Sequence, residues 1–444
     1  MDRYVGLDLH KSIVQSVILD ARGKEIAQSR FGCFREELLK FGRTQLKRSD
    51  RVVVEATTNT WSVVALLKPF VREVVVSNPL QTKAIASAKI KTDKVDARVL
   101  AQLLRSDFLP RVWEPPPAVQ HARSVTGRRA ALIADRTAVK NRIHAALRQR
   151  LIIAPDRVFS PDGREWLKTL EMDDAGHMAI ESDLRLLGHY DQEVRAVDEQ
   201  LLKESYSNED VKLLVTLPGI DVAVAQTLAA ALGDINRFPD GDRAASYIGL
   251  VPSTRSSANH CTHGPITKQG NSRARWMLVQ AAQNVASHPG PLGAFFRRLC
   301  KRKSRNVAIV ATARKLVVIA WHMLKHREPY RYAQPATTQS KLRRIRTAHG
   351  EKRRATGRVI STRDHPKDPA RQERRVPALR EVYQTEGLPS CAPTKPAEAR
   401  ILDEANVTPH VAAIAKDQWK PVNRRRSTKG VKSRARAQKV QDRA

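Results

Sequence analysis

The stretch RVVVEATTNTWSVVALLKPFVREVVVSN, Arg51 to Asn78, decides the fold of the N-terminal region. It holds two continuous apolar runs of strand length, residues 51–56 and 72–78, on either side of an apolar helical segment. Upstream, three short segments separated by turn signals predict a three-stranded meander, and a helix is expected over residues 35–46. Strand–helix–strand order after a meander predicts an α/β sheet with helices against it.

Four carboxylates fall where they can meet at one edge of that sheet. Asp8 lies inside the first strand, and Glu55 closes the apolar strand at residues 51–55. An acid embedded in so apolar a strand is costly unless it faces a metal or a partner. Asp93 and Asp96 begin the next expected helix and share one of its faces, where they could also serve as an N-cap and a first-turn acid. Together the four acids predict an oxygen-only site for Mg2+, and two such ions could polarise a phosphodiester.

The net charge of +34 over 444 residues favours a polyanionic partner, because Lys or Arg that neutralises a phosphate releases counterions. A membrane is disfavoured, since there is no N-terminal signal pattern and the longest apolar run, NVAIVATARKLVVIAWHML, carries Arg314 and Lys315 at its centre. The four cysteines form no Cys-x-x-Cys pair, which fits a reducing cytoplasm. Aromatic residues make up 5% of the chain, which disfavours a platform of stacked bases.

Residues 113–208, which begin with the proline-rich WEPPPAVQ, are expected to be helical. Apolar residues recur there every seven positions, as in a helical hairpin or coiled coil. These residues are Val125, Leu132, Val139 and Ala146, and then Ile180, Leu187, Val194 and Leu201. The heptads alone leave packing within one chain and pairing between two chains equally open.

Residues 209–333 are predicted to form a mainly helical C-terminal domain. LVTLPGIDVAVAQTLAAAL, Leu214 to Leu232, has the pattern of a helix-hairpin-helix, in which the amides of the turn at Gly219 can hold a DNA phosphate. Many such hairpins are only structural.

Further along, YIGLVPSTRSSANHCTHGPITKQGNSRARWML, residues 247–278, places Ser256 and Ser257 in a polar loop before a basic segment that runs into a helix. The basic residues are Lys268, Arg273 and Arg275. A serine beside phosphate-binding cations or a metal can attack phosphorus and form a covalent intermediate. The plain alternative is a solvated turn. Residues 334–444 are rich in Pro, Arg, Lys and Glu and are expected to form a mostly disordered basic tail.

The motifs VGLDLHK, VVVEAT, NPLQTKAIASAKIKTDKVDARVLAQLL, LPGI, YIGLVPS and GPITKQGNSRARWML resemble, in order and spacing, the insertion-sequence one-ten family of transposases with its eleven-eleven subgroup. The resemblance covers residues 1 to about 335. It implies a RuvC-like, RNase H-like DEDD domain at residues 1–112, a dimerising coiled coil at 113–208 and a serine-bearing domain at 209–333.

The resemblance also implies the roles of individual residues and partners. Asp8, Glu55, Asp93 and Asp96 would be the metal-binding tetrad, and a serine would form a phosphoserine link to DNA. Counting back from ITK selects Ser256, which we favour, whereas counting forward from GLVP selects Ser257. The implied partners are Mg2+, donor and target DNA, a bridge RNA encoded by the element, and further copies of the chain in a homodimer or tetramer. The implied place of action is the prokaryotic cytoplasm, at the nucleoid.

The sequence therefore predicts a Mg2+-dependent, RNA-guided DNA recombinase of a mobile element. One alternative is a structure-selective nuclease in which the same four acids activate water. A second is a non-catalytic nucleic-acid-binding protein, or an inactive transposase copy, in which the acids are helix caps and the charge alone binds the ligand.

Overall fold

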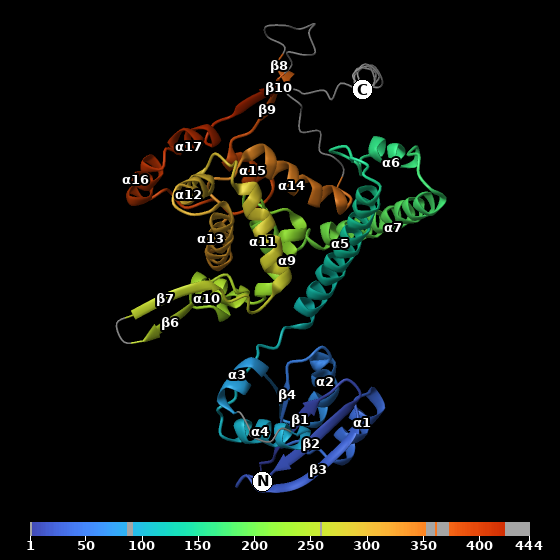
Figure 1. The fold of residues 1–444 in the computed structure, drawn as a ribbon. Coiled ribbons are helices and arrows are strands. Elements are labelled where there is room, and N and C mark those ends of the chain that lie inside the picture. The colour runs from blue at the N-terminus through green and yellow to red at the C-terminus, as the bar shows by residue number, and fades with distance from the viewer. Residues whose placement is uncertain (1, 87–91, 258–259, 352–359, 362–372, 422–444) are drawn as a thin grey trace. The chain divides into compact units, whose positions relative to one another are not determined.

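The computed structural model describes residues 2–86, 92–257, 260–351, 360–361 and 373–421. The chain divides into two compact units, Met1–Pro116 and Pro117–Ala444. The helical region predicted from residue 113 onward thus shares its unit with the C-terminal helices. Figure 1 shows the helices and strands of each unit.

The first unit is built on a five-stranded sheet in the order β3-β2-β1-β4-β5. β1 (Tyr4–Leu9), β2 (Ile13–Leu19) and β3 (Glu25–Gly32) form the antiparallel meander, and β4 (Arg51–Glu55) and β5 (Glu73–Ser77) continue the sheet in parallel. The helices are α1 (Arg35–Thr44), α2 (Thr60–Leu67), α3 (Pro79–Ile85) and α4 (Asp93–Arg105), with a short 3-10 helix, η1 (Lys68–Phe70). The predicted mixed α/β domain is confirmed.

The two faces of this sheet have separate apolar cores. On one face, valines and leucines of β1 and β4 pack with α1 and α2. On the other, Val53 and Val75 pack with Leu100 and Leu104 of α4. α4 also approaches β1 very closely, because a Cβ atom added to Gly6 would lie 1.9 Å from the Ala97 carbonyl oxygen. A glycine at this position is therefore required for α4 to lie where it does.

The second unit begins with two long antiparallel helices, α5 (Pro117–Gln149) and α7 (Asp174–Glu204), joined through α6 (Pro161–Lys168). Four arginines, three on α5 and one just after it, form ion pairs with four aspartates, one just before α7 and three along it. The pairs run in antiparallel order. These pairs are Arg129–Asp198, Arg136–Asp191, Arg142–Asp183 and Arg150–Asp173. The heptad residues Leu132, Val139, Ile180 and Leu187 are buried. The heptad faces of the two helices thus find apolar partners within the same chain.

The next elements of this unit are helices that pack around one apolar core and a β-hairpin that extends from it. They are α8 (Glu209–Leu214), α9 (Val222–Leu232), η2 (Ile235–Arg237), α10 (Gly241–Ile248), the hairpin β6 (Pro252–Ser257) and β7 (His260–Ile266), α11 (Ser272–Val285), α12 (Pro291–Cys300) and α13 (Arg305–His326). Among the described residues, α13 is the one helix long and apolar enough to cross a membrane, and 56% of its apolar window is buried in this unit.

The prediction of a disordered tail from residue 334 is wrong for most of the described part. The chain forms α14 (Pro335–Ala348), β8 (Ile360–Ser361), β9 (Glu373–Val376), α15 (Leu379–Thr385), α16 (Pro396–Glu404), α17 (Thr408–Ile414) and β10 (Gln418–Pro421). Leu342, Ile345 and Tyr383 join the same core as α8 to α13. Apolar residues are few among the charges of this segment, so no sustained apolar period stands out. The basic segment at residues 422–444 lies outside the described residues.

Candidate functional site

Asp8 and Glu55 lie at the same end of two adjacent parallel strands. Leu7 pairs with Val54, so the next residues along each strand, Asp8 and Glu55, are neighbours in register. Side chains alternate between the faces of a sheet, and Val53 packs on α4, so the Glu55 side chain lies on the face that α4 covers. The same alternation from Gly6 places Asp8 on that face.

α4 brings two further acids to this edge. Its N-cap is Thr92, whose Oγ1 accepts a hydrogen bond from the Val95 amide at 3.2 Å, and Asp93 and Asp96 lie in the first turn. The alternative that Asp93 caps the helix is therefore wrong, because the preceding threonine fills that role. Both aspartates remain at the positive end of α4, where the helix dipole favours negative charge.

His10 joins these acids in the structure. Its Nε2 lies 3.1 Å from Asp8 Oδ2 and 3.3 Å from Asp93 Oδ1. Burial raises the pKa of the Asp8 carboxyl, and His10 opposes this rise. The negative charges of Asp93 and Asp96 raise that pKa further. The negative charges of at least three carboxylates therefore act on one another. Asp8, with 14% of its side chain exposed, is more buried than His10 and Asp93.

This donor set fits a divalent metal. One ligand atom each from Asp8, His10 and Asp93 lies within 4.8 Å of the others. A divalent cation would relieve the electrostatic repulsion among the carboxylates. In its absence, His10 is the group that offsets their effect on Asp8. Carboxylate oxygens suit Mg2+, while an imidazole also suits Mn2+ or Zn2+. Sequence reasoning missed His10, although VGLDLH places it two residues after Asp8 and hence on the same side of the chain.

Ser256 and Ser257 lie in the second unit, on β6. They pair with Cys261 and His260 of β7, so the structure places them in an exposed β-hairpin arm and not in the loop that was expected. Figure 1 shows this arm extending from the helical core. Successive side chains on a strand point to opposite faces, so the two serines face opposite sides of the arm.

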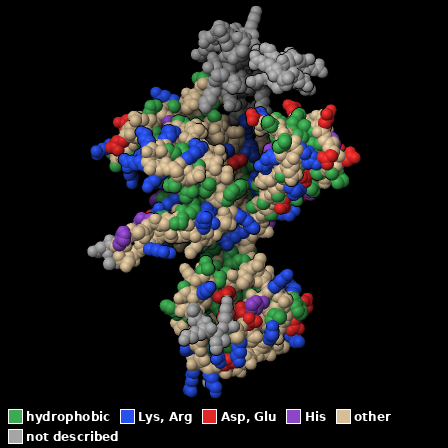
Figure 2. Space-filling model, in the orientation of Figure 1, with side chains coloured by type: hydrophobic (Ala, Val, Ile, Leu, Met, Phe, Trp, Pro, Cys, Tyr) green, Lys and Arg blue, Asp and Glu red, His purple; other side chains and the backbone are tan. Residues whose placement is uncertain are grey.

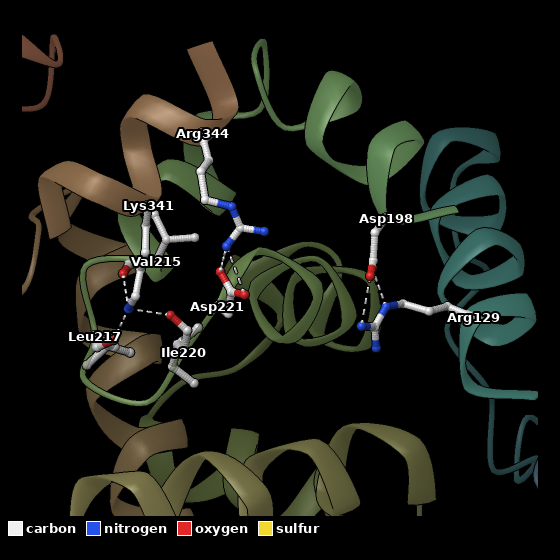
Figure 3. Close-up of polar contacts among 8 residues, drawn as sticks. All are labelled: Arg129, Asp198, Val215, Leu217, Ile220, Asp221, Lys341 and Arg344. Atoms are coloured by element: carbon white, nitrogen blue, oxygen red, sulfur yellow. Dashed lines mark hydrogen bonds and ion pairs between the residues drawn. The ribbon is translucent and has the colours of Figure 1, made fainter. Parts of the chain in front are cut away.

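The turn at Gly219 connects α8 to α9, and α14 covers its carbonyl side (Figure 3). Lys341 Nζ donates hydrogen bonds to the carbonyl oxygens of Val215, Leu217 and Ile220 at 2.9, 3.2 and 2.6 Å. Burial lowers the pKa of Lys341 to about 8, against the influence of Asp221. The protonated amine prevails at neutral pH and offers three N–H donors to the three oxygens.

The three predicted basic residues differ in their exposure and in their hydrogen bonds. Arg275 donates to the carbonyl oxygens of Ile248 and Gln269, which holds the start of α11 in place. Lys268 and Arg273 are exposed. Figure 2 shows Lys and Arg side chains spread over the visible face of the second unit. The cationic surface is therefore broad.

Comparison with known proteins assigns the chain to a class. Residues 5–152 match the model of the DEDD domain of IS110 transposases, and residues 211–297 match that of the IS116/IS110/IS902 transposase family. An uncharacterized 44.8 kDa protein of insertion element IS116 from Streptomyces clavuligerus is 24% identical over 75% of this chain and 97% of its own length.

Two transposases named for their insertion elements are also similar. The transposase of IS1111A from Coxiella burnetii is 26% identical over 54% of this chain and 68% of its own length. The transposase of IS1328 from Yersinia enterocolitica is 28% identical over 58% of this chain and 75% of its own length. The protein is thus a transposase of an insertion element. It belongs to the IS110/IS116/IS902 family, with the N-terminal and C-terminal domains of that family together covering more than half of the chain.

Proposed function

We propose that this transposase cuts and rejoins DNA in a reaction that depends on a divalent metal, with Mg2+ as the natural ion. Asp8, Glu55, Asp93 and Asp96 would hold it, with His10 beside them. The observation that carries the proposal is the convergence of Asp8 with Asp93 and Asp96 at the end of β1. A divalent ion held by these residues would supply a Lewis acid for the scissile phosphodiester.

Ser256, or Ser257 in the other register, is the proposed nucleophile. Its Oγ would form an ester bond to phosphorus while the bond from phosphorus to a deoxyribose oxygen breaks, and the serine proton passes overall to that oxygen. The phosphoserine link retains the bond energy, so attack by a DNA hydroxyl can rejoin the strands without a high-energy cofactor. The exposure of both serines on the hairpin arm supports access by DNA.

Two finer structural assignments belong to the same proposal. The sheet order β3-β2-β1-β4-β5, with three antiparallel strands followed by two parallel ones, supports the RuvC-like, RNase H-like fold. The helix–turn–helix sequence α8–Gly219–α9 supports a helix-hairpin-helix that contacts a DNA phosphate. Lys268 and Arg273 would add phosphate contacts, whereas Arg275 would position α11.

An RNA encoded by the element and further copies of the chain are the proposed partners, and the cytoplasm near the nucleoid is the proposed location. The net charge of +34 supports binding of more than one polyanion. The acids and the serines lie in different units, which allows one subunit to supply the acids and another the serine. Leu151 and Ile153, each 91% exposed after α5, offer apolar surface for such association.

Two other functions remain as outcomes of the test. In a nuclease, the acidic site would activate water and leave no protein–DNA bond. In a non-catalytic binder, no strand would be cut with or without metal.

The test is cleavage of labelled donor DNA by the full-length protein with its RNA, in Mg2+, in Mn2+ and in chelator. We expect cleavage only with divalent metal, and Asp8→Asn to slow it by about 100-fold or more, because the amide keeps the shape but removes the charge. Asp2→Asn, at an exposed residue of the same segment, is the matched control. Cleavage that survives chelation, or that Asp8→Asn leaves unchanged, would refute the metal site.

A further inference from the structure

A groove of about 720 Å3 lies between α5 and the first turns of α11 in the second unit. No Asp or Glu lines it among the described residues. Ala130, Ala134 and Ala138 are among the α5 residues along it, and their small side chains leave room for a flat group. The groove thus combines an apolar floor with the absence of any group that repels an anion.

Trp276 of α11 lines this groove with 48% of its surface exposed. An indole offers a large, flat and rigid face, and leaving half of it in water forgoes the stabilisation that burial would give. Trp276 lies three residues after Arg273, so the two side chains share one face of the helix. A ring face and a guanidinium are therefore presented side by side.

Arg273 supplies the uncompensated positive charge of the groove. It makes no hydrogen bond or ion pair within the described part of the chain, and its Nη1 lies 2.6 Å from the position a Cβ atom on Gly127 would take. The other arginine of the groove, Arg129, is neutralised by Asp198, with Nε 2.6 Å from Oδ1 (Figure 3). The N-terminus of α11, capped by Asn271, adds positive potential near Arg273.

We propose that this groove binds one unpaired nucleobase, stacked on Trp276, with an adjoining phosphate on Arg273. An apolar planar group joined to an anion matches the ring face, the free guanidinium and the absence of acids. A base inside a duplex is covered by its neighbours and cannot present its face, so the ligand is single-stranded or splayed out. The low aromatic content of the chain agrees with a one-base site and not a platform. The inference rests on the proposed function only in taking nucleic acid as the ligand.

The test is the equilibrium binding of full-length protein to fluorescent oligonucleotides, without metal so that nothing is cut. Single-stranded DNA, RNA of the same sequence and blunt duplex DNA are compared at several salt concentrations. We expect Trp276→Ala to weaken single-strand binding about tenfold or more, and Trp276→Phe to retain most of it, because a ring is what stacks. Duplex binding should change little. Trp419→Ala, at another exposed tryptophan, is the matched control and should bind as wild type.

Arg273→Gln tests the phosphate contact. We expect it to weaken binding and to lower the slope of log affinity against log salt by about one, as removal of one phosphate contact requires. A loss of affinity for only one of the two single strands would support the site and show whether the bound nucleotide belongs to RNA or to DNA. Equal affinity of Trp276→Ala and wild type for both single strands, or an equal loss on duplex, would overturn the proposal.

A change from dimer to monomer in Trp276→Ala, measured by light scattering, with unchanged single-strand affinity would also overturn it, in favour of a surface between two copies. Because binding is measured without metal, a failure of the proposed cleavage chemistry leaves this result intact. Conversely, an active transposase that binds normally after Trp276→Ala refutes the base site alone.

Discussion

Gly6 sets the distance between β1 and α4, and the acidic site depends on that distance. A Cβ atom there would lie 1.9 Å from the Ala97 carbonyl oxygen and 2.9 Å from the Ala101 amide nitrogen. We expect Gly6→Ala to push the start of α4 away from β1, to destabilise the first unit by about 2 kcal/mol, and to weaken divalent-metal binding. Urea unfolding and calorimetric titration with Mn2+ measure the two effects.

Gly188→Ala is the matched control for this prediction, because nothing lies within 4 Å of the added methyl group on α7. It should leave metal binding unchanged and stabilise the helix slightly, since alanine favours a helix more than glycine. If Gly6→Ala binds metal as tightly as wild type, the close approach of α4 is not what assembles the site.

The convergence of Asp8 with Asp93 and Asp96 could be predicted from the sequence, because each lies in a strand or at a helix start that the apolar pattern locates. His10 could not be singled out in the same way, since a histidine after a strand has many ordinary uses. The pairing of Lys341 with three carbonyl oxygens was also beyond sequence reasoning. It joins residues 121 to 126 positions apart, which no local pattern encodes.

At the scale of elements, α14 is part of the C-terminal fold and not a tail. Leu342 and Ile345 enter the common core, while Lys341 and Arg344 hold the turn at Gly219 and Asp221. Composition suggested disorder because the cations dominate the segment. The apolar residues of α14 are few, but they fall three residues apart on one helical face and meet a core that already exists.

Removing the amine of Lys341 tests how far α14 holds this turn. We expect Lys341→Met to destabilise the second unit by about 2–4 kcal/mol, because the methionine keeps the apolar stem while the carbonyl oxygens of Val215 and Ile220 lose the amine donor. Chemical denaturation followed by circular dichroism measures the change. Arg343→Met removes a cation from the exposed side of the same helix and should cost much less. Equal effects of the two variants would contradict the account of the turn.

At the scale of the whole molecule, the proposed chemistry is divided between two compact units. The acids belong to Met1–Pro116, and the serines and the groove at Trp276 belong to Pro117–Ala444. The apolar heptad residues left pairing between chains open, but most of them are buried within one chain, where α5 packs on α7. The proposed association between copies would therefore use other surfaces, such as the exposed side chains of Leu151 and Ile153.

The most direct test of the central claim is a search for a covalent protein–DNA adduct. Full-length protein, its RNA, Mg2+ and labelled donor and target DNA are incubated and resolved on a denaturing gel. Wild type, Ser256→Ala, Ser257→Ala and Asp8→Asn are compared. We predict an adduct in wild type that is absent in Asp8→Asn and in Ser256→Ala. Ser257→Ala is the matched control and should still form the adduct; the reverse result would assign the nucleophile to Ser257. Metal-dependent cleavage without any adduct, or an adduct that survives in both serine variants, would contradict the serine mechanism.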